Sequence, residues 1–123
     1  MAYLLDSNLL IYSADDAHSF LRPLVQSTAN YVSVISQVET LGFHKLALAD
    51  QLYLESVFAI LGILPVSPSV IQRATVLRQQ QRLTLGDALI AATALDYGLD
   101  LATRNVGDFS RIAGLTVYNP FGS

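Results

Sequence analysis

Hydrophobic positions alternate between short runs and longer stretches with helical spacing. The short runs predict β-strands at Tyr3–Leu5, 31–35, 63–66, 99–102 and 116–118. The longer stretches predict helices at 8–14, 19–27, from 36 onward, 50–61, 68–81 and 84–97. Because strands alternate with helices, the pattern predicts an α/β fold with a mostly parallel central sheet.

Polar residues and turn formers set the expected helix ends. Pro23 fits only the first turn of the 19–27 helix, where its missing N–H costs nothing. Ser36 is expected to open the next helix, with Val38, Leu41 and Leu46 on one side. Thr84 is expected to cap the 84–97 helix.

Composition narrows the class of protein. The 123 residues suit one domain spanning 1–123, and 52% hydrophobic with 14% charged residues excludes intrinsic disorder. The chain has no cysteine, which excludes disulfides, zinc–thiolate sites and cysteine nucleophiles. The longest apolar run, 57–66, is far shorter than the ~20 residues of a membrane-spanning helix. The N-terminus has no basic segment, so we expect a soluble, cytoplasmic domain.

Four carboxylates are candidates for chemistry. Asp6 directly follows the first expected strand, and Asp108 lies in the expected loop after 99–102. Parallel α/β sheets bind ligands beyond the carboxyl ends of their strands, so these two acids fall where a site is expected. Asp87 begins a helix that is otherwise apolar, and Glu39 follows an apolar strand.

Each acid also has a local interpretation. Asp6 could cap the following helix, and Asp108 could be an ordinary turn residue. Glu39 and Asp87 could complete capping boxes that begin at Ser36 and Thr84. Taken together, however, four acids in apolar surroundings need a cation, and the chain has only 7 lysines and arginines. Oxygen-only ligands favour Mg²⁺ or Mn²⁺, as one or two ions, which suits phosphoryl displacement by water.

The segments around these acids resemble PIN-domain ribonucleases of the VapC-type toxins. The matching pieces, in order, are Leu5-Asp6-Ser7-Asn8, Ser36-Gln-Val-Glu39, Leu85-Gly-Asp87-Ala-Leu-Ile-Ala-Ala and Thr103-Arg-Asn105-Val-Gly-Asp108-Phe109. The resemblance implies a three-layer α/β/α fold with four to five strands. It also implies Mg²⁺- or Mn²⁺-dependent cleavage of RNA, with Asp6, Glu39, Asp87 and Asp108 as catalytic metal ligands.

The resemblance extends to supporting residues and partners. Ser7, Asn8, Thr103 and Asn105 would hold the carboxylates and their waters. Ser7 stands where the family usually has threonine, a change that keeps the hydroxyl. The family further implies a homodimer and a cognate antitoxin that blocks the site.

Net charge bears on how such a chain would hold RNA. At −3, with pI about 5.0, the protein lacks the strongly basic balance of most nucleic-acid binders. Two bound divalent cations would bring the formal charge from −3 to +1. A few arginines could add phosphate contacts. The candidates are Arg104 and Arg111 beside the proposed site, and Arg78 and Arg82 on a shared helix face.

Two other functions use a similar topology. A receiver-like phosphoacceptor domain also places acids at strand ends, but it needs an adjacent acidic pair after the first strand and a lysine after the last. Here Asp6 stands alone, and Lys45 is the only lysine. A catalytically silent protein-binding module is the other alternative, although the presence of all four acids argues against it.

Overall fold

Alternating side chains of the strands face two separate cores. In the computed structural model, which describes residues 2–122, Leu4 is buried in one hydrophobic cluster and Leu5 in the other. The same alternation separates Leu101 from Ala102. The sheet is therefore covered on both faces, as its apolar runs require.

Five short parallel strands form the sheet. They are β1 (Tyr3–Leu5), β2 (Tyr31–Ser33), β3 (Gly62–Leu64), β4 (Asp100–Ala102) and β5 (Val117–Tyr118). Their order is β3-β2-β1-β4-β5, and every neighbouring pair is parallel. The predicted α/β fold with a mostly parallel sheet of four to five strands is confirmed. This order differs from the 2-1-3-4-5 arrangement of receiver-like domains.

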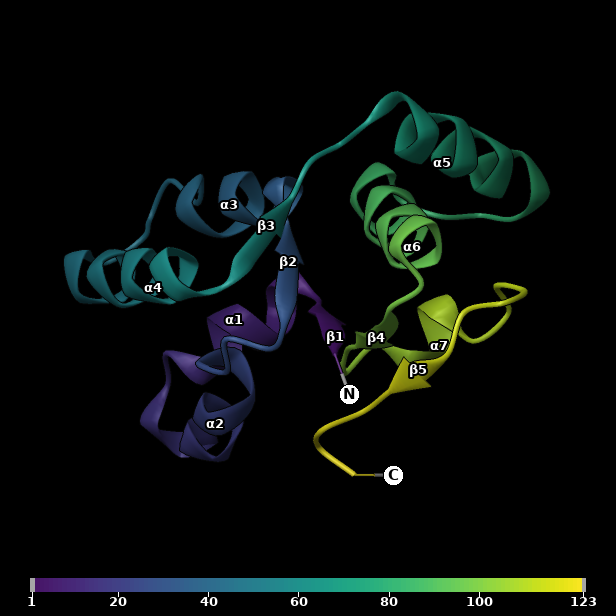
Figure 1. Cartoon of the computed structure of the whole chain (residues 1–123). Helices are drawn as coiled ribbons and strands as arrows, with labels where there is room; N and C mark the ends of the chain where they lie inside the picture. Colours follow the sequence, from purple (N-terminus) through teal and green to yellow (C-terminus); the bar gives the residue numbers. More distant parts are fainter. Residues whose placement is uncertain (1, 123) are drawn as a thin grey trace.

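Helices form a layer on each face (Figure 1). One layer comprises α5 (Pro68–Gln80), α6 (Leu85–Tyr97) and α7 (Val106–Phe109). The other comprises α1 (Ser7–Ser13), the 3₁₀ helix η1 (Asp16–Leu21), α2 (Arg22–Val25) and α4 (Leu48–Ile60). The remaining helix, α3 (Val34–Leu41), contacts α1, α4 and α6. Of the helices within residues 2–122, none has the length and apolarity needed to cross a bilayer.

The start of α3 corrects one sequence prediction. β2 ends at Ser33, whose Oγ accepts the Ile35 N–H at 3.1 Å and so caps α3. Ser36 therefore lies inside the helix, so the prediction that it opens the helix is wrong. The alternative interpretation of Glu39 as part of a Ser36 capping box is excluded with it. The helix also ends at Leu41, before Leu46. The β-branched run 31–35 favoured a longer strand and so placed the predicted helix start three residues too late.

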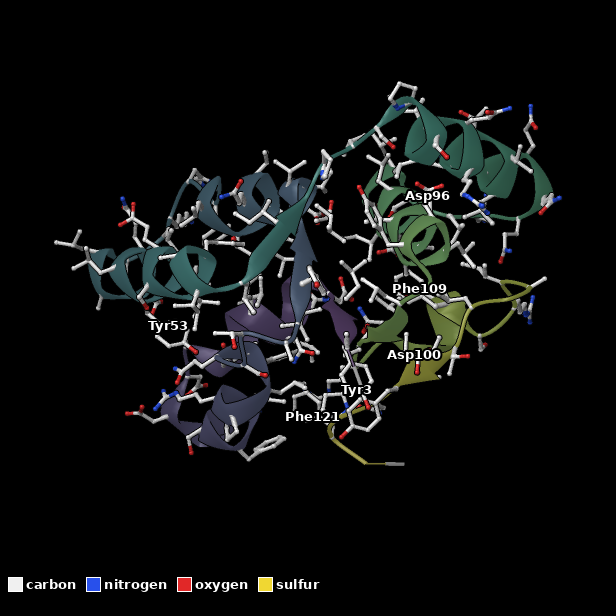
Figure 2. All side chains as sticks on the ribbon, in the orientation of Figure 1. Tyr3, Tyr53, Asp96, Asp100, Phe109 and Phe121 are labelled. Atoms are coloured by element: carbon white, nitrogen blue, oxygen red, sulfur yellow. The ribbon has the colours of Figure 1, made fainter. Side chains whose placement is uncertain are left out.

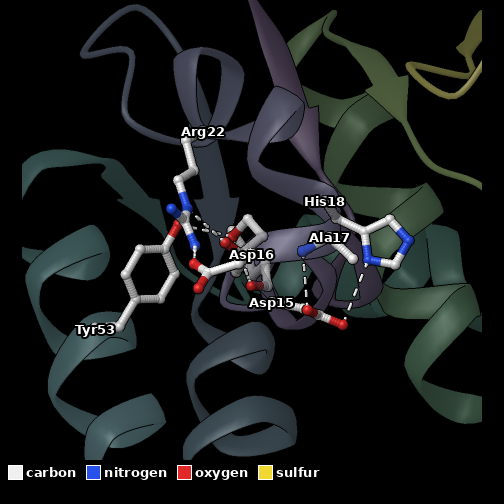
Figure 3. A network of polar contacts seen from close by, with 8 residues as sticks. Asp15, Asp16, Ala17, His18, Arg22 and Tyr53 are labelled. Carbon is white, nitrogen blue, oxygen red and sulfur yellow. Dashed lines mark hydrogen bonds and ion pairs between the residues drawn. The ribbon is translucent and has the colours of Figure 1, made fainter.

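The segment 19–27 is also not one helix. It divides between η1 and α2, and Pro23 lies in the first turn of α2 as expected. Asp15 accepts the Ala17 N–H at 3.0 Å, and Arg22 Nη2 donates to Asp16 Oδ1 at 2.9 Å (Figure 3). These acids thus order a turn.

Two smaller corrections affect candidate site residues. Asp108 lies in the four-residue helix α7 and not in a loop. Helix α5 ends at Gln80, because Gln81 is extended at φ −156° and ψ 164°. Arg78 and Arg82 therefore do not share a helix face. Both arginines are exposed, and Arg78 Nε donates to the Leu83 carbonyl beyond the end of the helix.

Candidate active site

The site begins where the strand order reverses. From β1 the chain moves outward to β2 and β3, and then returns to the other side of β1 as β4. The ends of β1 and β4 are therefore neighbours, and such a switch point leaves a crevice for ligands. Asp6 is placed here by its backbone, whose N–H donates to the Ala102 carbonyl at 2.9 Å.

Asp6 is buried and is held by Thr103. Only 4% of Asp6 is exposed, and Thr103 Oγ1 donates to Asp6 Oδ2 at 2.7 Å. Thr103 is itself fixed, because its N–H donates to the Tyr118 carbonyl at the end of β5. The same hydroxyl accepts the Asn105 N–H at 3.0 Å. A carboxylate in this position has one defined orientation.

Glu39 reaches the site from α3. Ser7 Oγ donates to Glu39 Oε1 at 2.7 Å and lies 2.9 Å from Ser36 Oγ. The other carboxylate oxygen lies against the first turn of α6. A Cβ at Gly86 would stand 2.5 Å from Glu39 Oε2, so glycine permits this approach. The amino end of α6 also carries partial positive charge, which favours the carboxylate.

Asp87 and Asp108 lie on α6 and α7, in the helical layer that also contains α5. Asp87 is half-buried in the first turn of α6, where Thr84 Oγ1 accepts its N–H at 3.1 Å and caps the helix. The Thr84 cap predicted from sequence is thus present. Asp108 projects from α7 and is exposed.

The pKa values of Asp6 and Asp87 respond to the charges of neighbouring acids, which places the four acids in one region. Burial raises the pKa of Asp6 to about 6 despite the Thr103 hydrogen bond, and the charges of Asp87 and Glu39 add to the rise. Burial also raises the pKa of Asp87, with the charges of Asp108 and Glu39 acting in the same direction. Within residues 2–122, none of the four forms an ion pair with a basic side chain.

This arrangement fits a divalent cation in charge and in donor chemistry. Unneutralised carboxylates that repel one another are stabilised when a hard cation binds, and all the donors are oxygen. As they stand, no three acidic or imidazole groups within the described chain are close enough to enclose an ion. Glu39 and Asp108 are exposed, and exposed side chains change rotamer rapidly. Binding would therefore draw Asp108, whose side chain has no hydrogen bond within residues 2–122, toward the carboxylates that Thr103 and Ser7 hold.

The other candidates occupy different surroundings. Asn8 follows on α1 and is half-buried, and it makes no side-chain hydrogen bond within residues 2–122. Asn105 is exposed and lines an open groove of about 590 Å³ with Arg104 and Asp108. Arg111 is exposed beyond α7.

Three residues escaped the sequence analysis. Gly86 is required by the approach of Glu39, and Tyr12 and Phe121 lie against Arg104. Gly86 lies within one of the matched motifs, so its position carried a signal. Tyr12 and Phe121 are 109 positions apart and carried none, because only folding brings them together.

Comparison with known proteins assigns this chain to a family. The family model for the PIN domain matches residues 3–115. The chain belongs to the PIN domain family. It is 58% identical over 40 residues to Ribonuclease VapC1 of Rickettsia felis, a match that spans 31% of this chain and 30% of that protein.

Solved structures agree over nearly the whole chain. A toxin-antitoxin complex from Klebsiella pneumoniae contains a chain that is 29% identical, with a TM-score of 0.78, covering 98% of this chain and 99% of that one. VapBC2 from Rickettsia felis, bound to a DNA fragment from its promoter, gives 25% identity and a TM-score of 0.79 over 97% and 98% of the two chains. FitAcB from Neisseria gonorrhoeae gives 26% identity and a TM-score of 0.76, covering 98% of this chain and 99% of that one.

Proposed function

We propose that this chain is a Mg²⁺- or Mn²⁺-dependent endoribonuclease and the toxin of a toxin–antitoxin system. The observation that carries the proposal is the group of acids around Asp87, where the charges of Asp6, Glu39 and Asp108 meet at the switch point of a PIN-domain sheet. The similarity to Ribonuclease VapC1 and to chains in toxin–antitoxin complexes supports it.

Asp6, Glu39, Asp87 and Asp108 would hold one or two cations. A bound divalent cation supplies positive charge to the scissile phosphate and lowers the pKa of water. The chain's own residues supply the positioning. Thr103 fixes the orientation of Asp6, and the Ser7 hydroxyl fixes that of Glu39. Displacement of the 3′ oxygen by water would leave 5′-phosphate and 3′-hydroxyl ends.

Cleavage of RNA by matched variants tests the proposal. We expect the wild-type chain to cut RNA in Mg²⁺ or Mn²⁺ and to be silent in excess EDTA. Asp6→Asn and Asp87→Asn should each lower the rate at least ~100-fold, because each removes a negative charge that would hold the cation at the reacting phosphate. Asp100→Asn is the matched control, since Asp100 opens β4 at the opposite end of the strand (Figure 2).

Three results would contradict the nuclease. These are cleavage that persists in EDTA, full activity of either site variant, or an equal loss in Asp100→Asn. Antitoxin binding without any cleavage in Mg²⁺ or Mn²⁺ would instead favour the catalytically silent binding module.

An apolar groove beside the acids supports the antitoxin as a partner. It has a volume of about 180 Å³, lies between α1, α3 and α4, and is lined by Ile11, Ala14, Glu39, Thr40, Phe43, Leu46, Asp50 and Leu54. Ile11 and Phe43 are about half exposed, and exposed apolar patches commonly mark interaction sites. The acids at its rim suit an apolar segment that also carries basic residues.

The antitoxin proposal is tested by co-expression with the product of the neighbouring open reading frame. We expect a stable complex that inhibits cleavage, and loss of that complex in Ile11→Asp. Ile71→Asp, an equal change at an exposed site on α5, should leave it intact.

We also propose that the chain forms a homodimer, as the family resemblance implies. Light scattering of the isolated chain tests this. A monomeric mass at all concentrations up to those used for cleavage would contradict the dimer.

A further inference from the structure

Arg104 is held by aromatic rings beside the acids. Its guanidinium carbon lies 4.2 Å from the centre of the Phe121 ring and 5.1 Å from that of Tyr12. The two rings contact each other edge to face at 5.4 Å. Tyr12 belongs to α1 and Phe121 to the segment after β5, so the three residues join distant parts of the chain. Figure 2 labels Phe121 on this C-terminal segment.

The C-terminal segment is itself anchored. Asn119 Oδ1 accepts the Phe121 N–H at 3.0 Å, and the Asn119 carbonyl accepts the Gly122 N–H at 3.1 Å. Phe121 also packs edge to face against His18 at 5.6 Å and Phe20 at 5.2 Å. The ring under Arg104 is therefore fixed by contacts on several sides.

The aromatic contacts leave the N–H donors of the Arg104 guanidinium free to bind another group. The guanidinium lies over the Phe121 ring and near the Tyr12 ring, and an aromatic contact of this kind uses none of its five N–H donors. Arg104 is exposed and makes no ion pair with an acid within residues 2–122. A planar guanidinium fixed in this way is suited to a bidentate contact with a phosphate.

The groove next to Arg104 has room for a nucleotide. It measures about 590 Å³ and runs between α7 and the C-terminal segment, lined by Arg104, Asn105, Val106, Gly107, Asp108, Val117, Asn119 and Gly122. One wall carries Asp108, a proposed cation ligand. The lining also includes Asn119, whose amide nitrogen can donate to a base edge while its oxygen accepts the Phe121 N–H. The groove thus adjoins the place where a phosphodiester would be cut.

We propose that this groove is the subsite for one nucleotide of single-stranded RNA flanking the cleaved bond, with Arg104 binding its phosphate. Phe121 and Tyr12 are positioning residues that act through Arg104. The inference rests on the proposed nuclease function but concerns only this chain's own residues. It makes the segment after β5 part of the substrate site.

The proposed subsite is tested by fluorescence anisotropy with a labelled single-stranded RNA of about ten nucleotides. The measurement is made in EDTA, because the contact between Arg104 and a phosphate needs no cation. Arg104→Ala should weaken binding about tenfold, the loss of one charge-assisted contact. It should also reduce the slope of log affinity against log salt by about 0.7. Arg73→Ala is the matched loss of charge, because Arg73 pairs with Asp96 at the far end of α6. Arg73→Ala should leave the RNA affinity and its salt dependence unchanged.

A double-mutant cycle separates positioning from simple packing. Phe121→Leu keeps an apolar side chain but removes the ring, and should weaken binding several-fold in the wild-type background only. In the Arg104→Ala background the same change should have no effect. Phe121→Tyr should bind as the wild type does, and Arg104→Lys should not restore affinity, because lysine lacks the planar fork.

The outcomes are distinguishable from those of the cleavage assay. RNA binding that is insensitive to Arg104→Ala, additive effects of the two changes, or no wild-type binding in EDTA would each overturn this inference, even with cleavage intact. Binding through Arg104 without any metal-dependent cleavage would overturn only the proposed function.

Discussion

The Glu39 carboxylate rests on the backbone of Gly86, so closely that a Cβ there would stand 2.5 Å from Oε2. We predict that Gly86→Ala displaces this carboxylate and lowers the rate of RNA cleavage about tenfold or more, because ångström-scale misplacement is costly in an active site. The free energy of unfolding should change by no more than about 1 kcal/mol, since alanine favours the helix.

Gln72→Ala provides a control for that change. Gln72 is exposed within α5 and lies outside both the acidic site and the proposed RNA groove, and alanine favours the helix there as well. Cleavage by Gln72→Ala should therefore stay near the wild-type rate. Equal rates for the two variants would show that Glu39 does not need its place beside Gly86.

Asp6 should destabilise the metal-free protein at neutral pH. Its pKa is about 6 in the fold against 3.8 in the unfolded chain, so the folded state binds the proton more tightly. The free energy of unfolding must then fall as pH rises from about 4 to about 6, by on the order of 3 kcal/mol. Asp6→Asn removes this loss and should be the more stable protein at pH 7, although inactive.

Urea unfolding in EDTA between pH 4 and 7.5 measures this effect. The difference between wild type and Asp6→Asn should grow across the pH window and then level off above it. A difference that is constant with pH would mean that burial does not raise the pKa of Asp6.

Thr103 should keep the pKa of Asp6 from rising further. Thr103→Val removes the hydrogen bond to Oδ2, which opposes the effect of burial. The acid limb of the cleavage pH profile should move to higher pH, and stability at pH 7 should fall by about 1–3 kcal/mol. Thr103→Ser retains the hydroxyl and should restore the wild-type profile. A valine variant with an unmoved profile would contradict this role.

Divalent cations should stabilise the folded chain through the same acids. At a hundred-fold excess over Kd, Mg²⁺ or Mn²⁺ would add about 2.7 kcal/mol, which raises Tm by several degrees. We expect this shift at pH 7.5 in the wild type and in Asp100→Asn, and not in Asp87→Asn. Calorimetric titration with Mn²⁺ checks the binding directly. Equal shifts in wild type and Asp87→Asn would place the cation elsewhere.

Much of the architecture followed from local pattern. The apolar run at Tyr3–Leu5 and the spacing within 84–97 predicted β1 and α6 within a residue or two. The helix from 34 was harder, because the β-branched run 31–35 satisfies both a strand and the first turn of a helix. The cap formed by Ser33 sets the boundary between β2 and α3. Whether Ser33 can form this cap depends on how the chain leaves the sheet.

By itself the sequence predicted four acids as candidates for one site, since their motifs lie in order along a strand–helix pattern that resembles the PIN domain family, and the chain belongs to that family. It also determined that the sheet is parallel. The tertiary structure alone decided that Asp6 is buried against Thr103, that Glu39 lies on Gly86, and that Arg104 stacks on Phe121. These contacts join residues far apart in the chain. Their geometry depends on how the two helical layers close over the sheet, which local periodicity does not encode.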